Sequence, residues 1–90
     1  MKLSHAAAEA IALDARTFIA SDDDLLSRFV AMTGIDPATV RSELQKEDFL
    51  HGVMHHLVQD EGLLVAFAAS AGLKPEQVAA AAQALGVRWE

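Results

Sequence analysis

Two histidines in the segment HGVMHH have the spacing that a metal site can use. His51 and His55 are four residues apart, so on a helix they share one face, one turn apart. Imidazole nitrogen is a common zinc ligand, but a structural site needs four ligands, and the chain has no cysteine and no HExxH motif. The sequence therefore gives a weak zinc hypothesis at His51 and His55. We favour the alternative, that both are solvated surface histidines, and expect no cofactor.

A second candidate is a helix-turn-helix DNA-binding module over residues 25–45. The glycine at Gly34 and the hydrophobic residue after it fit the turn of such a motif, and Arg41 can face outward from the second helix. Asp36 and Glu43, however, would face the phosphates. The whole chain carries thirteen acidic against seven basic residues, a formal charge of −6, which repels a phosphate backbone. Nucleic-acid binding is therefore the less favoured alternative.

Nucleophilic and acid-base catalysis find little support in the sequence. The chain has no cysteine and no tyrosine, no glycine-rich phosphate loop, and no serine in a nucleophile elbow. Its many acids are explained as helix caps or exposed helix positions, so no carboxylate pair requires a catalytic role. We expect a protein that is not an enzyme and has no small-molecule substrate.

The elements that carry these side chains are all predicted to be helices, because apolar residues recur with helical periodicity and strand-like alternation is missing. Helices are expected over about residues 4–20, 47–59, 62–71 and 75–86. A second helix is expected to start in the segment SDDD (residues 21–24) and end at Gly34, and a third to have Pro37 in its first turn. Acids and prolines favour the start of a helix, and glycine favours its end. The residues predicted to begin or end helices are Asp22, Asp23, Gly34, Asp36, Pro37, Asp60, Gly72 and Pro75. The fifth helix is apolar nearly all round, which predicts a place in the middle of the bundle.

One sequence pattern occurs twice in the chain: a glycine, a hydrophobic residue, any residue, a proline, any two residues and a valine. It reads GIDPATV from Gly34 and GLKPEQV from Gly72. The same offset of 38 residues aligns Phe29 with Phe67 and Asp22 with Asp60. The predicted fold is therefore an all-α compact bundle of five or six short helices in a single domain, residues 1–90, built as two tandem three-helix units. The alternative is a chance match of capping signals.

Membrane insertion is not expected. The longest apolar stretch, residues 62–73, would be about 18 Å long as a helix, shorter than the roughly 30 Å hydrocarbon core of a bilayer. The alanine-rich N-terminus is interrupted by charged residues before an apolar signal region forms. We expect a cytoplasmic protein.

The stretches FVAMTGIDPATVR (residues 29–41) and DEGLLVAFAASAGLKPE (residues 60–76) resemble DUF3572, a bacterial family of unknown function. The resemblance covers about residues 8–82. It implies a helical cytoplasmic protein whose motifs are helix caps and core positions, and it implies no activity, cofactor or catalytic residue. His51, His55 and His56 are not part of the family pattern, which weakens the zinc hypothesis.

The function that these observations favour is that of a non-enzymatic interaction or adaptor protein. Its partner would be another protein or a second copy of the chain, in a homodimer. The candidate contact residues are Leu13, predicted to lie on the polar side of the first helix, Arg41, and Trp89 near the C-terminus.

Overall fold

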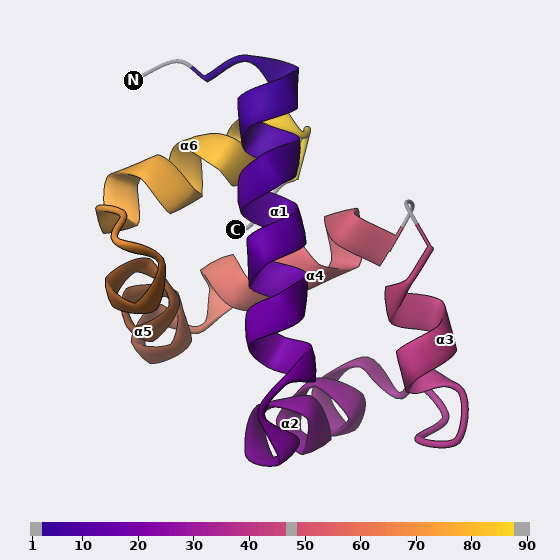
Figure 1. The fold of residues 1–90 in the computed structure, drawn as a ribbon. Coiled ribbons are helices and arrows are strands. Elements are labelled where there is room, and N and C mark those ends of the chain that lie inside the picture. The colour runs from indigo at the N-terminus through magenta and orange to yellow at the C-terminus, as the bar shows by residue number, and fades with distance from the viewer. Residues whose placement is uncertain (1–2, 47–48, 88–90) are drawn as a thin grey trace.

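The structure of the protein is a computed structural model that describes residues 3–46 and 49–87. These residues form six α-helices and no strand (Figure 1), which confirms the prediction of an all-α bundle. The helices are α1 (His5–Ala20), α2 (Asp23–Thr33), α3 (Val40–Leu44), α4 (Phe49–Gln59), α5 (Glu61–Ala71) and α6 (Pro75–Ala84). No helix among the described residues is both long enough and apolar enough to cross a membrane.

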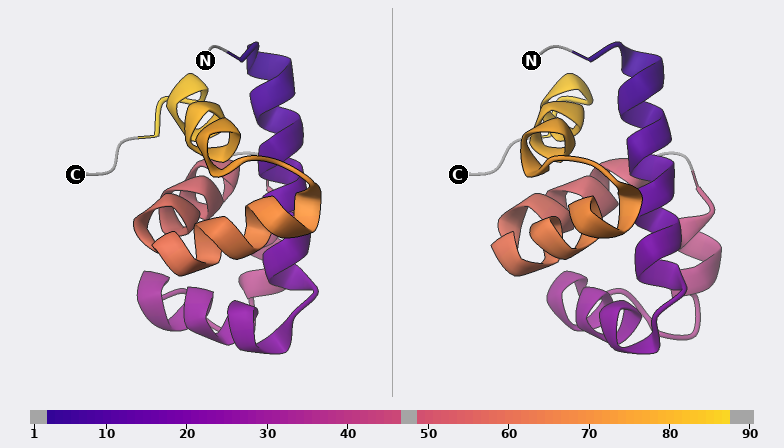
Figure 2. Two further views of the ribbon diagram at one scale, coloured as in Figure 1. Left: turned by 90° about the vertical axis from the view of Figure 1, so that its left-hand side faces the viewer. Right: turned by 60° about the vertical axis from the view of Figure 1, so that its left-hand side comes forward.

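Helix α1 is the longest element and packs most extensively against α6 and α4 (Figures 1 and 2). Its buried face carries Ala8, Ala12 and Ala15, all fully buried, so the neighbouring helices can approach its backbone closely. On α4 the fully buried side chains are larger, among them Met54 and Leu57. The core is therefore built where alanines of α1 meet bulky side chains of the other helices.

The corners of the bundle are made by local hydrogen bonds and by two glycines. Asp22 is the N-cap of α2, and Asp60 is the N-cap of α5. Gly34 and Gly72 end α2 and α5 with φ angles of 75° and 69°, the left-handed conformation that glycine adopts without strain. Pro75 is the first residue of α6. Both units therefore make their first corner in the same way, with an aspartate N-cap, and both end their second helix at a left-handed glycine.

Helix α3 begins later than the sequence indicates. Asp36 and Pro37 do not start it: they lie in a turn, where the Asp36 carboxylate accepts a hydrogen bond from the amide of Ala38 at 2.9 Å. The N-cap position falls at Thr39, which makes no side-chain capping bond. Asp36 thus satisfies the amide two residues on, as aspartate often does in a turn, and the chain delays the helix until Val40.

The prediction that the fifth helix lies in the middle of the bundle is wrong. Val65 on α5 is 48% exposed, and Ala66 and Ala69 are also exposed, whereas Leu63 and Phe67 face the core. Helix α5 lies at the edge of the bundle (Figure 2), and α1 and α4 occupy its centre. Apolar residues all round a helix show what the helix can bury, but they do not show how many neighbours surround it.

The two predicted units contact each other reciprocally. Phe18 of α1 packs against Phe67 of α5, and at the offset of 38 residues the equivalent pair is His56 of α4 and Phe29 of α2, which also pack ring to ring. The units differ in their third helices, since α3 has 5 residues and α6 has 10. The first two helices of each unit thus show the pseudo-repeat in space, and the third departs from it.

Candidate functional site

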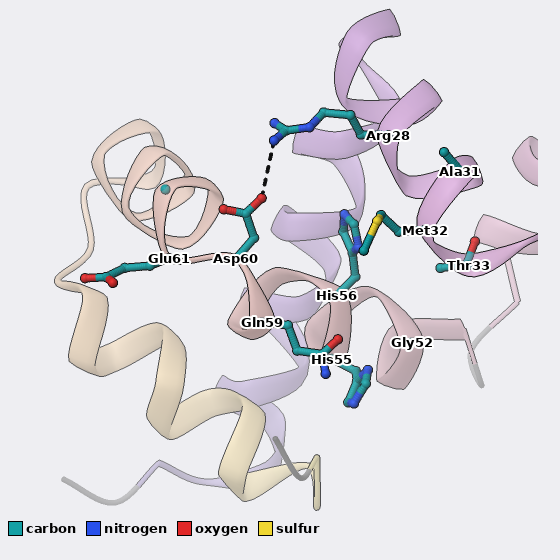
Figure 3. A pocket seen from close by; sticks show the side chains of 11 residues that line it. Arg28, Ala31, Met32, Thr33, Gly52, His55, His56, Gln59, Asp60 and Glu61 are labelled. Carbon is teal, nitrogen blue, oxygen red and sulfur yellow. Dashed lines mark hydrogen bonds and ion pairs between the residues drawn. The ribbon is translucent and has the colours of Figure 1, made fainter. Parts of the chain in front are cut away.

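An open cleft lies between α2, α4 and the start of α5 (Figure 3). Its volume is about 810 Å³. The wall from α2 includes Arg28, Ala31 and Met32, and the wall from α4 includes Gly52, His55, His56 and Gln59. Asp60, Glu61 and Gly62 close one end of the cleft.

The α2 wall is apolar toward its C-terminal end. Met32 is 76% exposed, the most exposed large hydrophobic side chain among the described residues, and its thioether points toward the cleft in Figure 3. The hydroxyl of Thr33 donates a hydrogen bond of 2.7 Å to the carbonyl of Phe29, so this polar group is satisfied within α2. The wall therefore offers a flexible apolar side chain that contacts water along most of its surface.

The α4 wall contains a glycine that the fold does not need. Gly52 lies within α4, where glycine is about 0.5–1 kcal/mol less favourable than alanine. Its φ is not positive, and a Cβ atom added to it would have no neighbour within 4 Å. Neither backbone geometry nor internal packing explains the glycine, and its effect is to leave the α4 backbone uncovered on the cleft side.

The inner wall is formed by the half-buried imidazole of His56. Its ring packs edge-on against Phe29, with the ring centroids 5.0 Å apart. Burial lowers the pKa of His56, an effect that nearby Asp60 opposes and that Arg28 and His55 reinforce. The imidazole is therefore neutral at pH 7 and behaves as a flat, weakly polar surface.

The polar end of the cleft is organised by Asp60. One carboxylate oxygen accepts a hydrogen bond from the amide of Leu63 at 3.1 Å and so caps α5. The other oxygen lies 3.5 Å from a guanidinium nitrogen of Arg28 on α2 (Figure 3). A single residue thus begins one helix and links it to another across the mouth of the cleft.

The two histidines of the zinc hypothesis have different surroundings. His55 lines the cleft, whereas the Nε2 atom of His51 lies 2.6 Å from the carbonyl oxygen of Leu85, the C-cap residue of α6. Metal binding through that nitrogen would break this contact. Within residues 3–46 and 49–87, no three histidine, cysteine, aspartate or glutamate side chains are grouped so that they can hold a metal ion.

The residues of the DNA-binding alternative serve the packing of α3. Arg41 donates a hydrogen bond of 3.3 Å to the carbonyl of Ala20, and its guanidinium lies 3.8 Å from the carboxylate of Asp23. These contacts link α3 to the corner between α1 and α2. With 5 residues, α3 is too short for the recognition helix of a helix-turn-helix, so the geometry gives this alternative no support.

Of the other two predicted contact residues, only Leu13 belongs to the part of the chain that the structure describes. Leu13 is 37% exposed on α1 and does not line the cleft. Trp89 lies outside the described residues. The sequence analysis did not single out Met32, Gly52 or Arg28. Gly52 could have indicated the α4 wall of the cleft, because a glycine inside an otherwise good helix is a recognisable signal.

The fold and the site define a class: the described residues form an all-α bundle of six helices with an open cleft between α2, α4 and the start of α5. The chain belongs to the family described as "Protein of unknown function (DUF3572)", whose family model matches residues 5–88. Comparisons with curated proteins and with solved structures found no match.

Proposed function

We propose that this protein is a non-enzymatic interaction protein that binds a segment of a protein partner in the cleft between α2 and α4. The observation that carries the proposal is the pairing of an exposed Met32 with a Gly52 that the fold does not require. Gly52 lowers the stability of α4, and Met32 leaves apolar surface in water that contact with a partner would bury.

The chemistry of the cleft favours binding over catalysis. Asp60 is engaged by Arg28 and by the amide of Leu63, and His56 packs against an aromatic ring. These groups hold the walls in place. Burying Met32 under a partner would contribute about 1.5–3 kcal/mol, and methionine adapts its shape to the surface that covers it.

Site-specific photo-crosslinking in the native cell tests the proposal. A benzophenone amino acid is placed at Met32 and, in a matched control, at Val65, which is 48% exposed on α5 and lies outside the cleft. Illumination is expected to give a discrete protein adduct from position 32 and none from position 65. An adduct with twice the mass of the chain would identify the partner as a second copy. Equal labelling at both positions, or none at position 32, would overturn the proposal.

A further inference from the structure

We propose that the segment bound in the cleft is a basic amphipathic helix of another protein, an inference that rests on the proposed function. The cleft is apolar at one end, around Met32 and Gly52, and acidic at the other, at Asp60 and Glu61. A helix with apolar residues on one face and a lysine or arginine further along that face matches both ends.

The shape of the cleft suits a helix. Its walls are two neighbouring helices, and an amphipathic helix binds in such a groove by its apolar face. Gly52 removes the side chain that would keep a third helix away from the α4 backbone, and Ala31 on the opposite wall is also small. A helix can therefore approach closely at this end, with an apolar residue covered by the Met32 thioether.

The charge of the cleft favours a basic partner. Arg28 is already paired with Asp60, at 3.5 Å, while Glu61 has no ion pair among the described residues and extends outward at the rim in Figure 3. Asp24 lies one helical turn before Arg28 on α2, outside the lining of the cleft, and is an exposed carboxylate. The formal charge of the whole chain is −6, so a second copy is repelled and a cationic segment is attracted.

The spacing of the two ends fixes the spacing expected in the partner. Gly52 and Asp60 are separated by about 12 Å along the axis of α4 at 1.5 Å per residue. A bound helix that runs alongside would therefore carry its basic residue about two turns, or roughly seven to eight positions, from the apolar residue that packs near Gly52. The expected partner segment is therefore recognisable in a sequence by an apolar residue and a basic residue at this spacing.

Titration of the isotope-labelled protein with two synthetic peptides tests the inference. One is an amphipathic helix of leucine and lysine, and the other has glutamate at every lysine position. The lysine peptide is expected to shift the amide resonance of Gly52 and the methyl resonance of Met32 in a saturable way, with affinity at least about tenfold above that of the glutamate peptide.

Variants of the protein localise the effect. Gly52→Leu fills the apolar end and is expected to weaken the lysine peptide about tenfold or more, whereas Ser70→Leu, on the exposed face of α5, is expected to change nothing. Glu61→Gln is expected to weaken the lysine peptide and not the glutamate peptide. Circular dichroism checks that each variant is folded.

The outcomes separate the inference from the proposed function. If the glutamate peptide binds the cleft as well as the lysine peptide does, the basic partner class is overturned and the cleft remains an interaction site. If both peptides shift only residues outside the cleft, or if Gly52→Leu has no effect, the docking geometry is overturned. The photo-crosslinking result stands independently of both.

Discussion

The imidazole ring of His56 packs edge-on against the ring of Phe29, with the centroids 5.0 Å apart and the ring planes at 89°. At the offset of 38 residues the equivalent pair is Phe18 and Phe67, whose centroids are 5.4 Å apart. A histidine therefore takes the place in one unit that phenylalanine fills in the other. The replacement falls on the wall of the cleft, where it introduces a group that can be protonated.

The first prediction concerns the pH dependence that His56 gives to stability. Burial lowers its pKa in the folded chain, so below the unfolded value near 6.5 the unfolded state binds more protons. The contribution of His56 to the free energy of unfolding is therefore full above that pH and falls as the pH is lowered toward the folded pKa. His56→Phe, which copies the Phe18 and Phe67 contact, is expected to remove this loss. Urea denaturation of both proteins between pH 7.5 and pH 5 measures it.

His55→Asn is the matched control, because His55 is the exposed neighbour on the same helix. The curves of stability against pH for His56→Phe and the wild type should diverge on acidification. Those for His55→Asn and the wild type should diverge less, because both proteins keep the half-buried imidazole of His56. Parallel curves for His56→Phe would show that the imidazole is not held in its neutral form by burial.

The second prediction is that two Gly→Ala substitutions act in opposite directions. Gly52→Ala should stabilise the protein by about 0.5–1 kcal/mol, because alanine favours the helix and its Cβ meets no atom. Gly34→Ala should destabilise it by about 1–2 kcal/mol, because an L-residue is strained in the left-handed conformation. Thermal unfolding of the two variants compares them directly. A loss of stability with Gly52→Ala would mean that the α4 backbone needs the glycine after all.

Much of the fold could be predicted from the sequence because helix ends depend on local chemistry. Asp22, Asp60, Gly34 and Gly72 act through bonds to residues two to four positions away, so their roles can be read in the chain. The delayed start of α3 shows the limit of this reasoning. A proline after an aspartate is typical both of a first helical turn and of a turn before a helix.

The candidate site could not be predicted in the same way, because it depends on which helices are neighbours. The periodicity of α5 is that of a buried helix, yet one side of it meets no other element and leaves Val65 exposed. Likewise, Met32 and His56 come together only because α2 packs beside α4. Long-range packing of this kind leaves no mark on local residue spacing.

The third prediction separates the two roles of Asp60. Asp60→Ala removes both the cap of α5 and the ion pair with Arg28, whereas Asp60→Ser keeps a capping oxygen and removes only the ion pair. The alanine variant is expected to lose about 1 kcal/mol, and the serine variant only a few tenths, because the pair is exposed to solvent and such pairs contribute about 0–1 kcal/mol. Chemical denaturation measures both.

Asp22→Ala supplies the comparison for that experiment. Asp22 caps α2 by accepting hydrogen bonds from the amides of Asp24 and Leu25, at 2.9 and 3.1 Å. Asp22→Ala should lower the free energy of unfolding by about 1 kcal/mol, which is the effect of losing the cap alone. An equal loss in Asp60→Ser and Asp60→Ala would contradict the assignment, because it would place the stabilisation in the ion pair.

The fourth prediction concerns the contact between His51 and the end of α6. The carbonyl oxygen of Leu85 accepts, so the Nε2 atom of His51, 2.6 Å away, carries the proton. Carbonyls at the end of a helix lack intrahelical partners, and this bond satisfies one of them. It also holds the segment that follows α6. In that segment the Val87 side chain is buried, and the Val87 amide donates a hydrogen bond of 2.9 Å to the carbonyl of Ala82. His51→Phe keeps a ring of similar size and removes the donor. It should cost about 0.5–1.5 kcal/mol and speed hydrogen exchange at the amide of Val87, while the amides of α2 keep their protection. Unchanged exchange at Val87 would mean that the packing of its side chain, and not the imidazole, fixes the end of α6.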